Sequence, residues 1–502
     1  MRRSESIRFF DFTGGLNTKS PVTALAYNQA LDLQNINLLP SGGFEKRRGN
    51  SAFNSSAMES GAALHGIGYY RQADADEFLV CIVGTKIYTS PMSGTMTDRT
   101  AALTITTGAN NLWTSFVMND NIHFVGGAPN APIVWNGTGN ASALGGSPPS
   151  GSFGLTHNRR AFIGNTTSNP SRIAWSILGS PADWTGAGSG TQDIQEGDGD
   201  TLVTAIPLNV NHLVCFKQNS IHDLITTTAP FPTFPLFNNV GCVGKLAAVL
   251  ADGLIYFITP QARMKATDGI KIYEFSDAID DVWDGLNQSR IQYISGIYNK
   301  RLQQIWWFCS NGSATTNNYC IVWDIKKQAW LRHTTGVTMN VATRTQAGTI
   351  YGGAYDGKAY QMDVASTYTD ASEATPSAIS AFWRSGWYDL EKMIESKFFR
   401  YVYLSIVSQT TGTFEFGYGF DFVSDRSFVP ISMLAAGSLW NQFQWDSGTW
   451  GGQSDVIRLS FVKGKGNYFQ FLLRNKNAAE AFQFNGMQIP IKIGASQAFK
   501  SG

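Results

Sequence analysis

The sequence contains few residues of the kind that form cross-links or metal sites. Only five of the 502 residues are cysteine, at positions 81, 215, 242, 309 and 320, and none has C-x-x-C spacing. An odd count without that spacing excludes a disulfide framework and the common zinc motifs. Four of the cysteines lie in apolar stretches typical of core strands, and Cys309 and Cys320 are placed to face each other across a hairpin.

Charge is also scarce. Asp, Glu, Lys and Arg make up 15% of the chain, and 38 basic residues against 37 acidic ones leave a net charge of +1. This balance excludes the global positive field that holds nucleic acid or an anionic membrane. The basic clusters at 2–3, 46–48 and 463–465 are short and scattered, as solvated or interface positions usually are.

Long apolar runs are absent as well. Nowhere do 18 apolar residues occur together, and the first ten residues carry three arginines but no apolar run of signal-peptide length. The sequence therefore predicts no membrane anchor and no secretion signal. We expect a chain that is made and assembled in a reducing cytoplasm.

Catalytic motifs are missing too. The six histidines form no H-E-x-x-H or H-x-x-x-H pair, and G-x-S-x-G does not occur. Residues 352–358 have the G-x-x-x-x-G-K skeleton of a phosphate-binding loop, but residue 359 is alanine and lacks the hydroxyl that would hold magnesium. The surrounding pattern indicates a hairpin where that motif needs a helix. The sequence predicts no catalytic residue, no cofactor and no metal.

Two acidic clusters have alternative interpretations. Asp193, Glu196, Asp198 and Asp200 lie in a Gly-rich loop that could offer oxygens to calcium, although the spacing differs from known calcium loops and favours a solvated loop. The acids at 277, 280, 281 and 284 lie in a predicted helix, 276–286, with Ser276 as its cap. A carboxylate pair for sugar hydrolysis is conceivable there. Acids on the polar face of a helix are the favoured reading.

What the chain does contain is β-structure in a repeating pattern. Aromatic residues make up 13% of it and 51 residues are glycine, as in turn-rich β proteins. A polar turn followed by an apolar strand recurs at 71–83, 118–126, 156–164, 208–216, 250–258, 298–308 and 343–353. The copies are roughly 40 to 50 residues apart, which is the length of one propeller blade. Residues 61–367 are therefore predicted to form a β-propeller of six or seven blades.

The flanking regions lack this repeat. Residues 1–60 are predicted to be an extended arm that helps to close the propeller, with a short helix near 24–33. After a small, polar boundary at 368–377, alternating strands at 401–407, 413–420, 456–462, 468–473 and 484–493 predict a jelly-roll-like β-sandwich over 378–502. The predicted fold class is all-β.

An ordered set of short motifs lies in residues 14–49. It comprises Gly14-Gly15-Leu16-Asn17, Ser20-Pro21, Asn28-Gln29-Ala30, an asparagine at 35 or 37, and Gly43-Phe44-Glu45-Lys46-Arg47-Arg48-Gly49. This order resembles the opening of the tail nozzle proteins, or tail tubular protein B, of short-tailed bacteriophages. It is similar also to the packaged-DNA stabilisation proteins, whose order of arm, propeller and C-terminal β domain matches the whole chain.

The resemblance implies a structural virion protein without enzymatic activity. Six copies would form a tail cylinder below the portal and its adaptor, retain packaged DNA and let it exit into the host. The implied partners are the chain itself as a hexameric ring, the head-to-tail connector, tail fibres or tailspikes, a tail needle, and passing double-stranded DNA bound without sequence specificity. A near-neutral chain suits such a conduit because strong phosphate binding would hinder sliding.

This interpretation assigns roles to two sets of residues. Ring closure needs complementary contacts between copies. We therefore expect a neighbouring subunit or the adaptor to contact Gly14, Gly15, Asn17, Lys46, Arg47 and Arg48. A channel constriction or a neighbour contact is expected at the acids Asp193, Glu196, Asp198 and Asp200 and at Phe231 and Phe234 of the Pro-rich segment 227–235.

Two other functions compete with the nozzle. A phage tail-tip or receptor-binding propeller protein would recognise a host surface glycan, with Trp440, Trp445 and Trp450 in a Gly/Ser/Gln-rich loop as candidate contacts. A propeller enzyme acting on polysaccharide would need convergent acids or a His/Tyr pair at the propeller centre, and the sequence contains no recognisable set. A glycan array and a turnover assay separate both from a nozzle.

Overall fold

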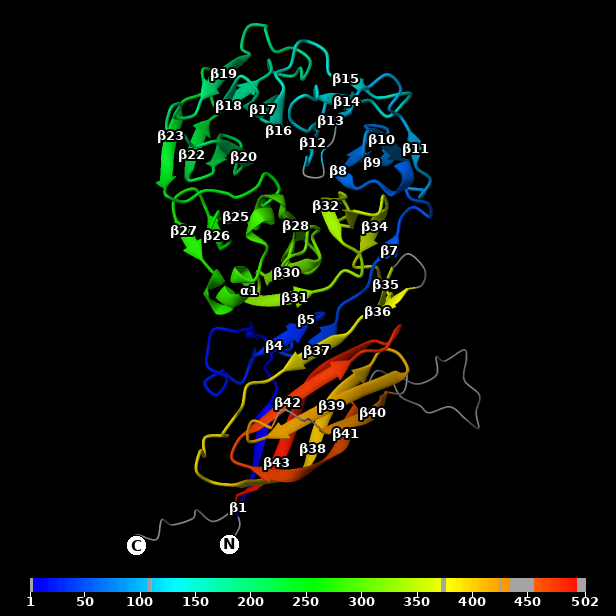
Figure 1. The fold of residues 1–502 in the computed structure, drawn as a ribbon, viewed down its shortest axis with the longest axis vertical. Helices are drawn as coiled ribbons and strands as arrows, with labels where there is room; N and C mark the ends of the chain where they lie inside the picture. The colour runs from blue at the N-terminus through cyan, green and yellow to red at the C-terminus, as the bar shows by residue number, and fades with distance from the viewer. Residues whose placement is uncertain are drawn as a thin grey trace.

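The chain consists of two β bodies in contact, a ring of sheets and a sandwich (Figure 1). A computed structural model describes residues 3–106, 108, 111–371, 376–423, 427–433 and 456–493. No helix within these ranges is both long enough and apolar enough to cross a membrane.

The ring contains seven four-stranded sheets in the described residues, which are the blades of a propeller. Blade 1 contains β8 (Leu64–Arg71), β9 (Glu77–Val83), β10 (Lys86–Ser90) and β11 (Thr97–Asp98), and blade 2 contains β12 (Thr114–Met118), β13 (Asn121–Val125), β14 (Ile133–Trp135) and β15 (Ser142–Ala143). Blade 3 contains β16 (Gly151–His157), β17 (Arg160–Thr166), β18 (Asn169–Trp175) and β19 (Gly190–Asp193), and blade 4 contains β20 (Leu202–Pro207), β21 (His212–Lys217), β22 (Ser220–Ile225) and β23 (Thr233–Asn238).

Blades 5 to 7 complete the ring. Blade 5 contains β24 (Ala248–Ala251), β25 (Leu254–Ile258), β26 (Met264–Thr267) and β27 (Ile272–Glu274). Blade 6 contains β28 (Ser295–Asn299), β29 (Gln304–Cys309), β30 (Tyr319–Asp324) and β31 (Ala329–His333). Blade 7 contains β32 (Met339–Arg344), β33 (Ile350–Ala354), β34 (Ala359–Met362) and β7 (Ser51–Ala52).

The ring is closed. The first strands of successive blades, β8, β12, β16, β20, β24, β28 and β32, each contact the next, and β32 contacts β8 (Figure 1). The outermost strand of blade 7 is β7, which comes from the N-terminal region and pairs with β34. Each hairpin of the sequence repeat joins the first two strands of one blade. The predicted all-β propeller is confirmed, and the blade number is seven.

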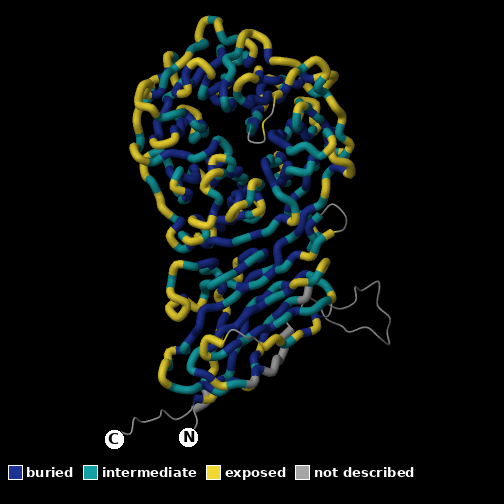
Figure 2. The backbone as a smooth tube through the Cα atoms, in the orientation of Figure 1, coloured by how far each residue is buried: buried dark blue, intermediate teal, exposed yellow. Residues whose placement is uncertain are grey.

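Blades pack face to face, so their central strands are buried on both sides. All six residues of β29 are buried, including Trp306 and Trp307, whose side chains point to opposite faces of the sheet. Exposed residues gather instead on the turns and the outer strands of the ring (Figure 2). This explains why the second strand of each repeat is almost continuously apolar in the sequence.

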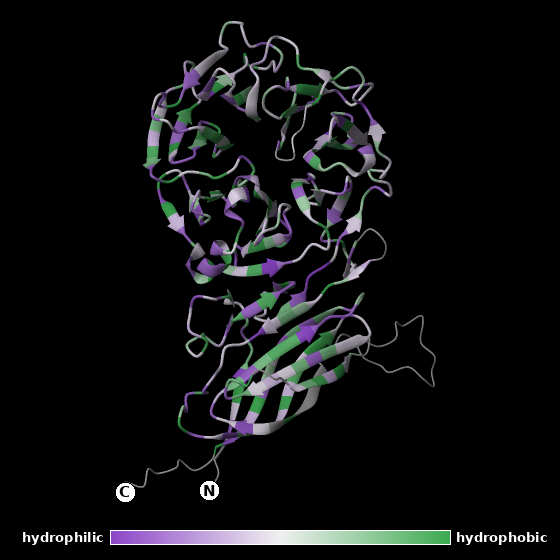
Figure 3. Cartoon of the chain, in the orientation of Figure 1, coloured by the Kyte–Doolittle hydropathy of each residue, from purple (hydrophilic) through white to green (hydrophobic). Residues whose placement is uncertain are grey.

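The second body is a sandwich of a six-stranded and a five-stranded sheet in the described residues. The six-stranded sheet contains β1 (Arg3–Phe9), β5 (Ile36–Leu38), β6 (Phe44–Lys46), β38 (Lys397–Ser408), β41 (Val456–Gly466) and β43 (Phe482–Ile493). The five-stranded sheet contains β4 (Asp32–Gln34), β37 (Ala381–Arg384), β39 (Gly412–Phe420), β40 (Ser427–Met433) and β42 (Phe469–Asn475). Hydrophobic and hydrophilic residues alternate along several of these strands (Figure 3).

The N-terminal region is not an extended arm, contrary to our expectation. Four of its strands, β1, β4, β5 and β6, complete the sandwich, where β1 pairs along its whole length with β43. The five strands predicted in the C-terminal region are present as β38, β39, β41, β42 and β43. The sandwich therefore needs both ends of the chain.

The helix predicted near 24–33 does not form. This stretch contains a turn closed by the Ala24 N–H donating to the Pro21 carbonyl, then the short strands β3 (Gln29–Ala30) and β4. Leu33 pairs with Trp383 of β37, and Tyr27 packs edge-on against Tyr388 at 4.7 Å between ring centroids. Leu25 and Leu33 are buried and Leu31 is half-buried. Pairing with distant strands outweighs the weak local preference for a helix.

The predicted helix at 276–286 is shorter than expected. A 3-10 turn, η2 (Ser276–Ile279), leads into α1 (Asp280–Asp284). Of the apolar residues expected on one face of the helix, Ile279, Trp283 and Leu286 are buried and Val282 is half-buried. Ser276 is not the cap, because its hydroxyl donates to the Met264 carbonyl at 2.9 Å.

The remaining elements are short. They are β2 (Gly15–Leu16), η1 (Glu59–Gly61), η3 (Gln288–Tyr293), β35 (Thr369–Asp370) and β36 (Ser377–Ala378).

All five cysteines are buried as free thiols. Across the β29–β30 pair, Cys309 lies opposite Tyr319 and Cys320 opposite Phe308, so the two thiols are offset by one residue.

Candidate functional site

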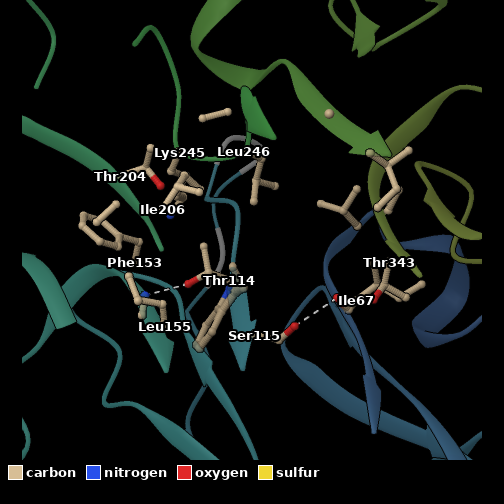
Figure 4. Close-up of a pocket in the computed structure, with 18 of the residues that line it drawn as sticks. Ile67, Thr114, Ser115, Phe153, Leu155, Thr204, Ile206, Lys245, Leu246 and Thr343 are labelled. Carbon is tan, nitrogen blue, oxygen red and sulfur yellow. Dashed lines mark hydrogen bonds between the residues drawn. The ribbon is translucent and has the colours of Figure 1, made fainter. Parts of the chain in front are cut away.

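The first candidate site is a cavity of about 320 Å³ on the axis of the propeller. Its walls come from the first strands of the blades and the loops before them. The lining residues include Ile67, Thr114, Ser115, Phe153, Leu155, Thr204, Ile206, Lys245, Leu246, Thr343 and Arg344 (Figure 4). Apolar side chains alternate there with hydroxyl groups. A concave space with such a mixed lining is typical of small-ligand sites.

The charged side chains that line this cavity are all positive. Lys245 and Arg344 are the charged residues among its described lining, which contains no carboxylate, imidazole or thiol. The Nη1 of Arg344 donates to the Tyr298 carbonyl at 3.0 Å, and its guanidinium lies over the Tyr298 ring at 5.4 Å. The walls therefore offer positive charge and hydroxyl groups.

Lys245 is the chemically distinctive residue of the cavity. It lies in the loop before β24 of blade 5, and its Nζ donates to the Ser152 carbonyl of blade 3 at 2.9 Å. Burial lowers the pKa of this ammonium group to about 8, and no nearby charge opposes the shift. The sequence analysis missed Lys245 because it belongs to no motif.

The second candidate site is the joint between the propeller and the sandwich, which contains the ordered motifs of residues 14–49. The strand β2 packs against β31, the outer strand of blade 6, and β4 and β5 also contact β31 (Figure 1). Gly15 has φ +64°, and a Cβ added there would lie 2.7 Å from the Trp330 carbonyl oxygen. Only glycine combines this backbone conformation with such a close approach.

Asn17 fixes the turn that follows. Its Nδ2 donates to Ser20 Oγ at 3.0 Å and to Gln29 Oε1 at 2.9 Å, and its Oδ1 accepts the Ser20 N–H at 3.0 Å. Gly14 lies beside Asn28 and Gln29, so close that a Cβ would be 2.7 Å from Gln29 Cγ. Gly15 and Asn17 are thus buried inside the chain, and their expected contact with another subunit is wrong.

Asn35 and Arg47 form the centre of the joint. Asn35 is fully buried with φ +57°, and its Oδ1 accepts Arg47 Nε at 2.7 Å and the Thr334 N–H at 2.8 Å. Arg47 makes a bidentate ion pair with Asp370, in which Nη1 donates to Oδ1 at 2.9 Å and Nη2 donates to Oδ2. The exposed fractions of these two side chains are 7% and 3%. One network therefore links the sandwich, blade 6 and the connecting segment.

The other two basic residues of the motif differ in position. Lys46 is buried, and its Nζ donates to Asn475 Oδ1 at 2.7 Å and to the Asn477 carbonyl at 2.9 Å. Burial lowers the pKa of Lys46 to about 8 although Glu480 opposes the shift. The predicted subunit contacts of Lys46 and Arg47 are therefore wrong, since both side chains bond within the chain. Arg48 is half-buried and lines a second cavity of about 270 Å³; its contact with another subunit stays a prediction.

Each acid of the loop at 193–200 bonds to a neighbouring side chain of the propeller. Asp193 pairs with Arg172 at 2.6 Å, Glu196 accepts Asn169 Nδ2 at 2.8 Å, and Asp200 accepts the Ser220 hydroxyl at 3.0 Å. Asp198 pairs at 2.6 Å with Lys217, whose side chain is fully buried. Burial alone would raise the pKa of Asp198, but hydrogen bonds from Lys217 and the Asp200 N–H lower it overall.

The loop lies away from the propeller axis. It follows β19, the outer strand of blade 3, and none of its acids lines the axial cavity. Within the described residues, no three His, Cys, Asp or Glu side chains are grouped in a way that could hold a metal ion. A channel constriction or a neighbour contact at these acids stays a prediction, and Glu196 and Asp198 are exposed.

The two phenylalanines of the Pro-rich segment do not line the axial cavity either. Phe231 is buried between blades 3 and 4, with its ring centroid 4.6 Å from that of Trp175, and the Arg160 guanidinium lies 5.7 Å from it. Phe234 is on the outer strand β23, where 51% of it is exposed. Phe231 is packed inside the chain, so a channel or neighbour contact is wrong for it, while a constriction or a neighbour contact at Phe234 stays a prediction.

The other sequence features have structural roles. Residues 352–358 form the hairpin between β33 and β34, as the pattern predicted. Of the acids at 277–284, Asp280 pairs with Arg263 at 3.1 Å and Asp284 pairs with Arg263 at 2.7 Å. Trp440, Trp445 and Trp450 lie outside the described residues.

The fold and these sites define an all-β protein in which a seven-bladed propeller is joined to a β-sandwich by a buried hydrogen-bond and ion-pair network. No protein-family model and no curated protein matches the sequence. Among solved structures, the chain is similar to YCF48 bound to a D1 peptide (10% identity, TM-score 0.42, covering 65% of this chain and 97% of that one). It is also similar to the WD40 β-propeller domain of Doa1 (9% identity, TM-score 0.41, covering 62% and 96%). These similarities concern the fold only.

Proposed function

We propose that this chain is a structural protein of a short-tailed bacteriophage virion, the tail nozzle, assembled in the host cytoplasm as a hexameric ring below the portal and its adaptor. The observation that carries the proposal is the ordered motif at 14–49, which resembles the opening of nozzle and packaged-DNA stabilisation proteins. In this chain the same residues bind the sandwich to blade 6. The motif thus coincides with the joint that sets the angle between the two bodies.

A rigid joint is what a closed ring requires. A ring of identical copies closes only if the two contact surfaces of each copy keep a fixed angle, and otherwise an open filament forms. The Arg47–Asp370 pair and the Asn35 hydrogen bonds hold that angle with buried, directional contacts. This supports a role in a symmetric assembly.

The propeller axis itself is not the DNA conduit in this proposal. The grooves of B-DNA alone are about 12 Å and 6 Å wide. A duplex is therefore far wider than a cavity of about 320 Å³ lined by side chains. The lumen would lie between copies of the chain. A net charge of +1 suits such a lumen, because few phosphates would be neutralised and the DNA could slide.

Electron microscopy of virions tests the proposal. An epitope inserted in the exposed turn around Asp74, between β8 and β9, would be labelled with an antibody and the labelled vertex averaged. A nozzle gives label at a single vertex, on a sixfold collar below the portal, and no signal on a host glycan array. Label at fibre tips together with a glycan signal would refute the nozzle and support a receptor-binding protein. Unlabelled virions would refute both.

A further inference from the structure

The axial cavity contains a cation that has no counter-charge in the described residues. Lys245 uses one of its three N–H groups in the bond to the Ser152 carbonyl. Its pKa is lowered by burial alone, with no contribution from a carboxylate. The other charged lining residue, Arg344, is also a cation. A half-buried ammonium group in this setting is stabilised by any anion that enters.

Hydroxyl groups line the same space. The hydroxyl-bearing residues Thr204 and Thr343 line the cavity, and Thr204 and Lys245 lie near each other on one side of it (Figure 4). An oxyanion bound at Lys245 accepts a charge-assisted hydrogen bond from the ammonium group, and such bonds are stronger than those between neutral partners.

We propose that the axial cavity of the propeller is a binding site for a small oxyanion, a carboxylate or phosphate, with Lys245 as its ion-pairing residue. The space is sufficient, because one water takes about 30 Å³ and the cavity measures about 320 Å³. Ile206, Leu155 and Phe153 provide apolar walls that suit a short carbon chain attached to the anionic group. The proposal is independent of the role in the tail.

Isothermal titration calorimetry on the full chain, at low salt, tests this site. Inorganic phosphate and succinate are the two probes, and the one that binds more tightly identifies which source of oxyanion the site prefers. We expect saturable one-to-one binding that weakens at least about tenfold in Lys245→Met, where the ion pair is lost. The matched control is Lys271→Met, which removes an exposed lysine before β27 and should bind as the unchanged chain does.

A pH series provides a second, mutation-free readout. Lys245 with a pKa of about 8 loses its proton as pH rises, whereas phosphate remains a dianion above neutral pH. Affinity for phosphate should therefore fall on the order of tenfold or more between about pH 7.5 and 9.5. Lys245→Arg keeps its charge and should abolish this pH dependence while binding within a few-fold.

Several outcomes would overturn the proposal. They are the absence of binding of both probes up to about 10 mM, equal affinity in Lys245→Met, equal weakening in Lys271→Met, or affinity for phosphate that does not change with pH. If Lys245→Met fails to fold, the pH series on the unchanged chain and on the Lys245→Arg variant still shows whether phosphate binding depends on the charge of Lys245.

Discussion

Removing the carboxylate of Asp370 should destabilise the joint strongly. Asp370→Ala leaves the Arg47 side chain 7% exposed with its bidentate partner gone, and the remaining acceptors are Asn35 Oδ1, Thr334 Oγ1 and the Arg48 carbonyl, none of them charged. Breaking a buried ion pair from one side lowers the free energy of unfolding by about 3 to 5 kcal/mol, because the other charge stays in a medium of low polarity. We expect that loss in urea denaturation of the full chain, in the transition that includes the sandwich.

A double variant and a control sharpen this test. Arg47→Met combined with Asp370→Leu removes both charges, so its loss should be smaller than that of Asp370→Ala by more than about 1 kcal/mol. Asp284→Ala breaks an ion pair whose aspartate side chain is 68% exposed, and should change stability by less than about 1 kcal/mol. If Asp370→Ala behaves like Asp284→Ala, the joint does not depend on this pair and our account of it is refuted.

Three further predictions concern pH, glycine and the shared sandwich. His333 donates from Nε2 to the Ile36 carbonyl, and burial lowers its pKa to about 3. The unfolded state then gains a proton below about pH 6.5 while the folded state does not, so stability should fall by about 2 to 3 kcal/mol from pH 6.5 to 4.5, and His333→Gln should flatten that slope in thermal melts. Gly15→Ala should lower the free energy of unfolding by about 2 to 3 kcal/mol. The control Gly253→Ala has φ +83° and open space around it, so it should lower the free energy of unfolding by only about 1 kcal/mol, the cost of placing alanine in that backbone conformation. Equal losses in the two variants would contradict the clash with Trp330. Residues 378–502 expressed alone should lack cooperative unfolding by circular dichroism and regain it on co-expression with residues 1–50; a folded fragment would contradict the shared sandwich.

The propeller could be predicted because its information is local. Each blade begins with a hairpin whose polar turn and apolar second strand are neighbours in the sequence, as in 298–308, which became β28 and β29. Alternation along β39 and β43 likewise predicted their place in a two-layered sandwich. The sequence left the blade number open between six and seven, because the fourth strand of the sheet of β32, β33 and β34 is β7, which comes from the N-terminal region.

The site residues were harder to predict, because their partners are far away in the sequence. Lys46 and Arg47 look like a solvated basic cluster, yet they bind Asn475 and Asp370, which lie more than 300 residues further along the chain. Lys245 stands alone in the sequence and becomes distinctive only where blades 3 and 5 approach the axis. A cluster of charges within one segment says little about burial, since burial depends on what packs over it.

By itself the sequence determined the all-β class, the repeat of seven hairpins and the strands of the C-terminal region, because periodicity and turn chemistry act over a few residues. The tertiary structure decided that β1, β4 and β6 pair with strands from the C-terminal region, and that β7 closes the ring. It also decided which cations lie in a cavity and which lie in a joint. Those outcomes depend on long-range pairing, where the free energy of burial and of satisfied buried charges outweighs local preference.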